Sequence, residues 1–203
     1  MAAFGGPPEL NRYGVLRQRD KRNSMLTLKK RKNDRIVPTP RLIRLKVLDA
    51  TPLFIRHYAL NAEQLLLAIL RYNRLIDTFL DLTCYSLQNN VRTAIPGKRQ
   101  IETHEIYIGI NQKWRQYVIP VRAETSFVPI RESHIEQDMA VCLAKFPSLA
   151  CRPVAAQFMA NDLIALFEFE RSEGMMSIKD EKHYRIVPNE KLSDEEIKAY
   201  GRK

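Results

Sequence analysis

The stretch that decides the fold of this chain is residues 101–124, which read IETHEIYIGINQKWRQYVIPVRAE. Two runs rich in isoleucine, valine and tyrosine flank a short polar connector. This pattern is typical of two adjacent antiparallel strands joined by a tight connection. The stretch therefore predicts a β-hairpin, and both of its strands carry charged residues where a half-buried strand usually carries apolar ones.

The charged residues of this hairpin follow the alternation of side chains along a strand. Glu102 and His104 are expected on one face of the first strand, and Glu105 on the other. Arg122 and Glu124 are expected to share a face of the second strand. Carboxylates from two neighbouring strands can together hold a divalent cation, because hard cations need several oxygen ligands. A hairpin whose polar face is simply hydrated is the other interpretation.

Four segments of the chain carry a resemblance to a known family: 102–110, 117–124, 134–146 (HIEQDMAVCLAKF) and 151–170 (CRPVAAQFMANDLIALFEFE). They resemble the PD-(D/E)XK nuclease superfamily, the restriction-endonuclease-like fold, and are similar to uncharacterised bacterial endonuclease-like proteins. The similarity covers roughly residues 60–188. It implies an α/β (α+β) core with a mixed sheet flanked by helices, and metal-dependent hydrolysis of DNA phosphodiesters with Mg²⁺ or Mn²⁺.

The chain departs from the family pattern inside the catalytic motif. His104 stands at the position of the family aspartate, Arg122 at the first position of (E/Q)-A-K, and Glu124 at the position of the lysine. The resemblance therefore implies Glu102, Glu105 and Glu124 as metal ligands, His104 as a ligand or base, and Arg122 as a phosphate contact. Histidine suits manganese or zinc better than magnesium, and a guanidinium repels a cation. A catalytically inactive nuclease-fold protein that binds DNA or a protein partner is the alternative.

Positive charge is concentrated at the start of the chain. Of the net charge of +10, residues 1–50 hold 13 Lys and Arg against 4 Asp and Glu, whereas residues 51–203 hold 20 against 19. We expect residues 1–50 to form a basic arm, partly without fixed structure, and residues 51–203 to form one domain. A concentrated basic segment favours DNA, because each phosphate that is neutralised releases counterions; a solvated tail or one side of a protein interface is the alternative. The expected DNA contacts are Lys29, Lys30, Arg31, Lys32 and Arg35.

Trp114 lies in the hairpin connector between Lys113 and Arg115. An aromatic ring among cationic side chains can stack on bases while its neighbours contact phosphates. The same tryptophan can instead cover the end of the hydrophobic core. Both interpretations stay open at this stage.

The rest of the pattern predicts helices and strands around the hairpin. Asn61 is placed to cap a helical region over residues 61–92, either two helices or one broken near residue 72, and Ser133 opens a capping box for a helix over 133–146. Asp77 and Asp81 are interpreted as solvated charges of the first region rather than as further acids of the site. Residues 41–49 fit a strand or a basic amphipathic helix. The remaining predictions are a hairpin of 153–159 and 163–170, a strand over 177–187 and a short helix from residue 193.

Composition narrows the class of protein. No apolar run approaches eighteen residues, so no transmembrane helix or membrane partner is expected. The three cysteines, Cys84, Cys142 and Cys151, lack metal-ligand spacing and fit reduced thiols in a cytoplasmic protein. Homodimer formation is left open.

Overall fold

The computed structural model describes residues 16–18, 27–29, 34–93, 101–160, 162–172, 175–188, 191 and 193–200. The chain divides into two compact units, residues 1–35 and residues 36–203. In the first unit β1 (Leu16–Gln18) pairs antiparallel with β2 (Thr27–Lys29). The other residues expected to lack fixed structure, within 1–24, lie outside the described part of the chain.

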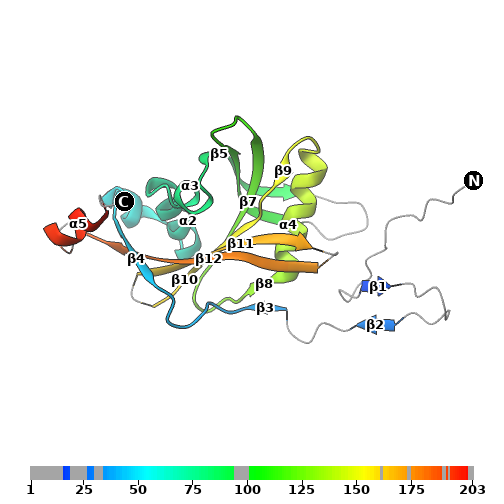
Figure 1. Ribbon diagram of the computed structural model, residues 1–203, viewed down its shortest axis with the longest axis horizontal. Helices are drawn as coiled ribbons and strands as arrows, with labels where there is room; N and C mark the ends of the chain where they lie inside the picture. Colours follow the sequence, from blue (N-terminus) through cyan, green and yellow to red (C-terminus); the bar gives the residue numbers. More distant parts are fainter. Residues whose placement is uncertain are drawn as a thin grey trace, which may run out of the picture. The chain divides into compact units, whose positions relative to one another are not determined.

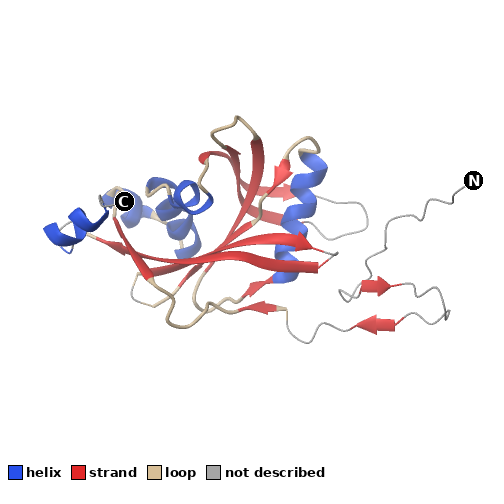
Figure 2. Cartoon of the chain, in the orientation of Figure 1, coloured by secondary structure: helices blue, strands red, loops and turns tan. Residues whose placement is uncertain are grey.

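An eight-stranded mixed sheet forms the centre of the second unit (Figures 1 and 2). Its order is β4–β12–β11–β10–β7–β6–β5, and β9 adds to β7. The strands are β4 (Arg44–Leu48), β5 (Thr83–Thr93), β6 (Ile101–Ile110), β7 (Gln116–Glu124), β9 (Ala150–Cys151), β10 (Val154–Phe158), β11 (Leu163–Ser172) and β12 (Met175–Val187). Two pairs are central to the argument: β6 and β7 are antiparallel, whereas β7 and β10 are parallel. Two short strands, β3 (Arg35–Ile36) and β8 (Ile130–Arg131), form a separate two-stranded sheet.

Helices cover both faces of this sheet. Ile119 and Val121 of β7 pack into the core formed with α2 (Ala62–Tyr72) and α3 (Leu75–Leu80), whereas the alternate Val118 packs against Cys142 of α4 (Glu132–Lys145). Because neighbouring side chains of a strand point to opposite faces, α2 and α3 lie on one face and α4 on the other. The two remaining helices are α1 (Leu53–Tyr58) and α5 (Asp194–Tyr200). No helix in the described part of the chain is long and apolar enough to cross a membrane.

The hairpin that was predicted from residues 101–124 is confirmed. β6 and β7 pair antiparallel from Ile110–Gln116 to Glu105–Val121, and the connector is tightened by Asn111, whose side-chain oxygen accepts the backbone N–H groups of Lys113 and Arg115. The helix across the sheet and the strands β10, β11 and β12 are confirmed as well. The coarse fold class, a mixed α/β arrangement of the α+β kind, therefore holds.

Other local predictions were open or wrong. Residues 44–48 form a strand, which settles the choice for 41–49, and β4 lies in the sheet of the second unit. The helical prediction over 61–92 is correct for α2 and α3 but wrong for residues 83–93, which form β5. Asp81 ends α3 in the left-handed region (φ 53°), and the chain then enters a strand. Asn61 caps α2 as predicted, but α4 begins at Glu132, so Ser133 is not its N-cap.

Candidate functional site

A buried ion pair joins the hairpin to the helix that crosses the sheet. Arg122 of β7 donates from Nε to Asp138 Oδ2 (2.7 Å) and from Nη2 to Asp138 Oδ1 (2.9 Å), a bidentate arrangement. Asp138 lies on α4, is 2% exposed and also accepts a hydrogen bond from Thr103 Oγ1 at 2.8 Å. Burial raises the pKa of Asp138, and Arg122 acts in the opposite direction. Bidentate arginine–carboxylate pairs are among the strongest and most directional polar contacts in proteins.

His104 occupies the space between the ends of the two strands. Its Nε2 lies 3.2 Å from Arg122 Nη1, and its Nδ1 lies 3.2 Å from the backbone nitrogen of Ala123. Because the regular pairing of the strands ends at Glu105–Val121, these side-chain contacts continue the connection between them. A neutral imidazole accepts at only one ring nitrogen, so the two donors compete for it. Burial, and then Arg122, lower the pKa of His104 to about 4.

Two further carboxylates face this group. Glu124 follows on β7 with Oε1 3.8 Å from Arg122 Nη1, and Glu63 of α2 places Oε1 3.4 Å from His104 Nδ1. Burial raises the pKa of Glu124, and Glu63 and Asp138 raise it further against the effect of Arg122. Burial also raises the pKa of Glu63. We call Glu63, His104, Arg122, Glu124 and Asp138 the Arg122 cluster.

Glu102 accepts a hydrogen bond from the cluster through its backbone, and its carboxylate raises the pKa of Glu63. Arg122 Nη2 donates to the Glu102 carbonyl oxygen at 3.0 Å. The Glu102 carboxylate instead lies 3.5 Å from Nε of Arg92 on β5, and 48% of its side chain is exposed. Of the four residues that were expected to converge, His104 and Glu124 both lie next to Arg122, whereas the Glu102 carboxylate lies beside Arg92. Arg122 was also expected to pair with Glu102 or Glu124, and it does pair with Glu124 at 3.8 Å, but its bidentate partner is Asp138.

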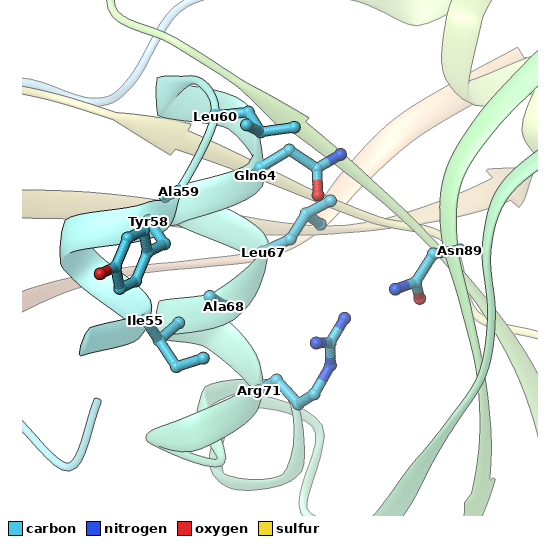
Figure 3. Close-up of a pocket in the computed structure, with 9 residues that line it drawn as sticks. All are labelled: Ile55, Tyr58, Ala59, Leu60, Gln64, Leu67, Ala68, Arg71 and Asn89. Carbon is cyan, nitrogen blue, oxygen red and sulfur yellow. The ribbon is translucent and has the colours of Figure 1, made fainter. Parts of the chain in front are cut away.

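Glu105 belongs to a different network on the α2 face of the sheet. It is fully buried, and Arg71 of α2 donates to its Oε1 from Nη2 (2.8 Å) and from Nε (3.1 Å). Ser86 of β5 donates to the same oxygen. Beside this network lies a cavity of about 230 Å³ between α1, α2 and β5, where Arg71 and Asn89 face each other (Figure 3).

The predicted metal ligands do not fit a divalent cation. Glu105 is committed to Arg71, Glu102 lies beside Arg92, and Glu124 lies next to the guanidinium of Arg122. A bound cation needs convergent oxygen ligands with no fixed positive charge among them. Across the described residues, no group of three or more histidine, cysteine, aspartate and glutamate side chains is arranged to hold a metal ion.

Of the five basic residues predicted to contact DNA, the structure describes two. Lys29 ends β2 in the first unit, Arg35 begins β3, and Lys30, Arg31 and Lys32 lie outside the described residues. Trp114 sits at the hairpin turn with a left-handed backbone (φ 60°) and 81% of its surface exposed. It therefore does not cover the end of the hydrophobic core, and stacking of Trp114 on bases stays a prediction.

Sequence reasoning missed three residues of this site. Asp138 meets Arg122 and Thr103 only through the packing of α4 on the sheet, which no local pattern reports. Glu63 lies in the first turn of α2, directly after the Asn61 cap, and that position was the available signal. Asp77 does not join the site, because it pairs with Arg74 and accepts the backbone N–H of Cys84.

No protein-family model matches this chain, and no curated protein and no solved structure is significantly similar to it.

Proposed function

We propose that this protein binds DNA with a nuclease-type fold in which an arginine has replaced the metal ion, so that it does not hydrolyse phosphodiesters. The observation that carries the second part is the bidentate pair of Arg122 with the buried Asp138, next to His104 and Glu124. At this site the guanidinium of Arg122 supplies the positive charge that a bound cation supplies to the carboxylates of a metal centre.

The order of elements supports the lineage. A helix, α2, packs on the sheet ahead of the hairpin, and its first turn brings a carboxylate, that of Glu63, to the end of the β6–β7 pair. The helix α4 follows the hairpin and crosses the other face. The resemblance, which covers roughly residues 60–188, implies a helix ahead of the hairpin, and the three departures from its motif gather in the Arg122 cluster.

Charge supports DNA as the partner. The first 33 residues hold nine Lys and Arg against two Asp and Glu, a balance of +7, and Trp114 is exposed on a hairpin turn beside Lys113. Each phosphate that a cationic side chain neutralises adds about 0.9 to the slope of log affinity against log salt concentration.

The test is duplex binding by fluorescence anisotropy over a range of salt concentrations. We expect Lys30→Gln, Arg31→Gln, Lys32→Gln to weaken binding and to flatten the salt slope by up to about 2.7. The matched control removes the same charge from exposed positions of the second unit, and its effect should be much smaller: Lys145→Gln, Arg171→Gln, Lys198→Gln. Equal losses in the two variants would show that binding depends on net charge and not on the arm.

Cleavage is tested separately by plasmid nicking with Mg²⁺ and with Mn²⁺. The native protein should leave the plasmid supercoiled with either ion, because Arg122 excludes the cation. Efficient nicking that is lost in Glu63→Gln or Glu124→Gln would contradict the proposal.

A further inference from the structure

A basic cavity lies at the far edge of the sheet from the Arg122 cluster's hairpin, where β4 and β12 run parallel. Its volume is about 540 Å³. The charged residues that line it are Lys46 of β4, Arg185 of β12, Lys191 and Asp162, and residues 186–188 form the remaining wall. Among the described residues, three cations and the Asp162 carboxylate line the cavity, and the Glu196 carboxylate pairs with Lys46.

Two of these cations oppose each other directly. Arg185 and Lys46 are partners in the parallel ladder, so their side chains emerge on the same face of adjacent strands. Like charges in directly opposed positions destabilise a sheet. Lys46 is compensated by an ion pair with Glu196 of α5.

Arg185 has no such compensation. Its Nε is buried and has no hydrogen-bond partner, and within the described residues its guanidinium forms no ion pair. A buried polar group without a partner is unfavourable, and native proteins usually satisfy such groups with protein, water or a ligand. An anion in the cavity would satisfy Arg185 and relieve its repulsion from Lys46.

We propose that this cavity binds a phosphoryl oxyanion between Arg185, Lys46 and Lys191. The planar guanidinium matches two oxygens of a phosphoryl group, and the ammonium groups add charge without fixed direction. The oxyanion is either a phosphate of the DNA backbone or that of a free phosphorylated molecule. The site does not depend on the nuclease lineage, and its occupation does not involve the Arg122 cluster.

Inorganic phosphate is the probe, titrated into the full-length protein against sodium chloride of equal ionic strength. Binding is measured by calorimetry and by the midpoint of thermal unfolding. We expect phosphate, and not chloride, to raise the midpoint, because a ligand of the native state stabilises it. Arg185→Gln should raise the dissociation constant for phosphate about tenfold or more, as expected for loss of charge-assisted hydrogen bonds.

The control variant is Arg44→Gln, which removes the same charge from an exposed position of the same strand pair outside the cavity. It should bind phosphate like the native protein. Without phosphate, Arg185→Gln should be at least as stable as the native protein, because the repulsion from Lys46 is gone. Lys191→Gln, an exposed substitution that leaves the sheet intact, should also weaken phosphate binding.

Equal responses of the native protein to phosphate and chloride would overturn the proposal, as would equal losses in Arg44→Gln and Arg185→Gln. A duplex-binding assay then separates the two sources. If phosphate competes with DNA and Arg185→Gln weakens duplex binding, the occupant is a backbone phosphate. If duplex binding is unchanged while phosphate binding is lost, the occupant is a free phosphorylated molecule. A protein that binds phosphate but no DNA would refute the proposed function and leave this site standing.

Discussion

Breaking the Arg122–Asp138 pair should be among the most damaging changes that can be made to this protein. Asp138 is 2% exposed, and without Arg122 it would retain only the hydrogen bond from Thr103. Removing one partner of a buried ion pair typically costs about 3–5 kcal/mol, because the other charge stays buried without compensation. We expect that loss of unfolding free energy for Arg122→Met and for Asp138→Leu, since the Arg122 side chain is itself only 8% exposed.

The double variant Arg122→Met, Asp138→Leu should lose far less than the sum of the two single changes. Replacing both charges with apolar groups of similar volume removes the desolvation penalty along with the attraction. We expect the double variant to be at least about 3 kcal/mol more stable than additivity predicts. Urea unfolding at neutral pH, followed by circular dichroism, gives the four free energies of this cycle. If the single variants are already unfolded, a folded double variant is the same result in a stronger form.

The pH dependence of the single variant adds a second check. In Arg122→Met the effect of burial is opposed only by the weaker influences of Thr103 and His134, so the pKa of Asp138 in the folded state should rise further above its unfolded value. A carboxyl with a raised folded pKa favours the native state at low pH and loses that contribution as the pH rises. The loss of unfolding free energy in Arg122→Met, relative to the native protein, should therefore become smaller as the pH is lowered from 8 to about 5. Two results would refute the buried-pair interpretation: free-energy losses of the single variants that simply add up in the double variant, or a loss in Arg122→Met that becomes larger as the pH falls.

Three further predictions concern other parts of the second unit. The folded pKa of His104, about 4, lies below its usual value of 6.5, so the stability that its neutral form contributes is present above pH 6.5 and is lost as the pH falls toward 4. His104→Gln should remove up to about 3 kcal/mol of this pH dependence, measured by urea unfolding at graded pH. An unchanged pH profile would contradict the prediction. Gly109→Ala should destabilise the protein by about 1–3 kcal/mol, because a Cβ there would lie 2.7 Å from Ile119 Cδ1 and 2.9 Å from Leu82 Cδ1. Adding Leu82→Ala to this variant should relieve part of the strain, as measured by thermal unfolding. If Gly109→Ala alone leaves the stability unchanged, the sheet adjusts to the added methyl group and the prediction is wrong. The triple variant His104→Asp, Arg122→Gln, Glu124→Lys returns the site to the pattern of the family that the chain resembles. It should nick plasmid DNA with Mg²⁺ only when Asp138→Asn is added, because Arg122→Gln alone leaves the buried Asp138 uncompensated. A folded quadruple variant that binds DNA and never nicks it would count against the nuclease lineage.

The hairpin could be predicted from the sequence because its information is local. Alternation of apolar residues and a polar connector suffice to define β6 and β7. The same information misassigned β5. Leucines at 80 and 82, after Leu75 and Phe79, extend a helical spacing, and the left-handed conformation of Asp81 that ends α3 is not visible in that spacing. Asparagine and aspartate tolerate this conformation better than most residues, and that was the weak signal available.

The composition of the site could be predicted only in part. The alternation of side chains along a strand correctly predicted that His104, Arg122 and Glu124 lie together. That argument assumes a regular ladder, and the β6–β7 ladder ends at Glu105, the residue next to His104. On its other side β6 pairs with β5, where Glu102 is the ladder partner of Arg92, so its carboxylate lies beside Arg92. Asp138 comes from a helix that packs across the sheet, so its role depends on tertiary packing that a single sequence does not report.

The residues at 104, 122 and 124, where the chain departs from the motif that it resembles, are physically consistent with one another. A guanidinium at position 122 needs buried negative charge around it, and Asp138, Glu124 and Glu63 supply it from three different elements. An aspartate at position 104 would add a further carboxylate to a pocket where burial and mutual repulsion already raise the pKa of Glu124. A neutral histidine avoids that charge and still accepts a hydrogen bond from Arg122 or from the Ala123 backbone. A lysine at 124 would place a second cation beside the guanidinium, whereas glutamate balances it. The residues at 104, 122 and 124 are thus mutually consistent around a fixed arginine, and it is the positive charge of Arg122 that works against a metal ion at this site.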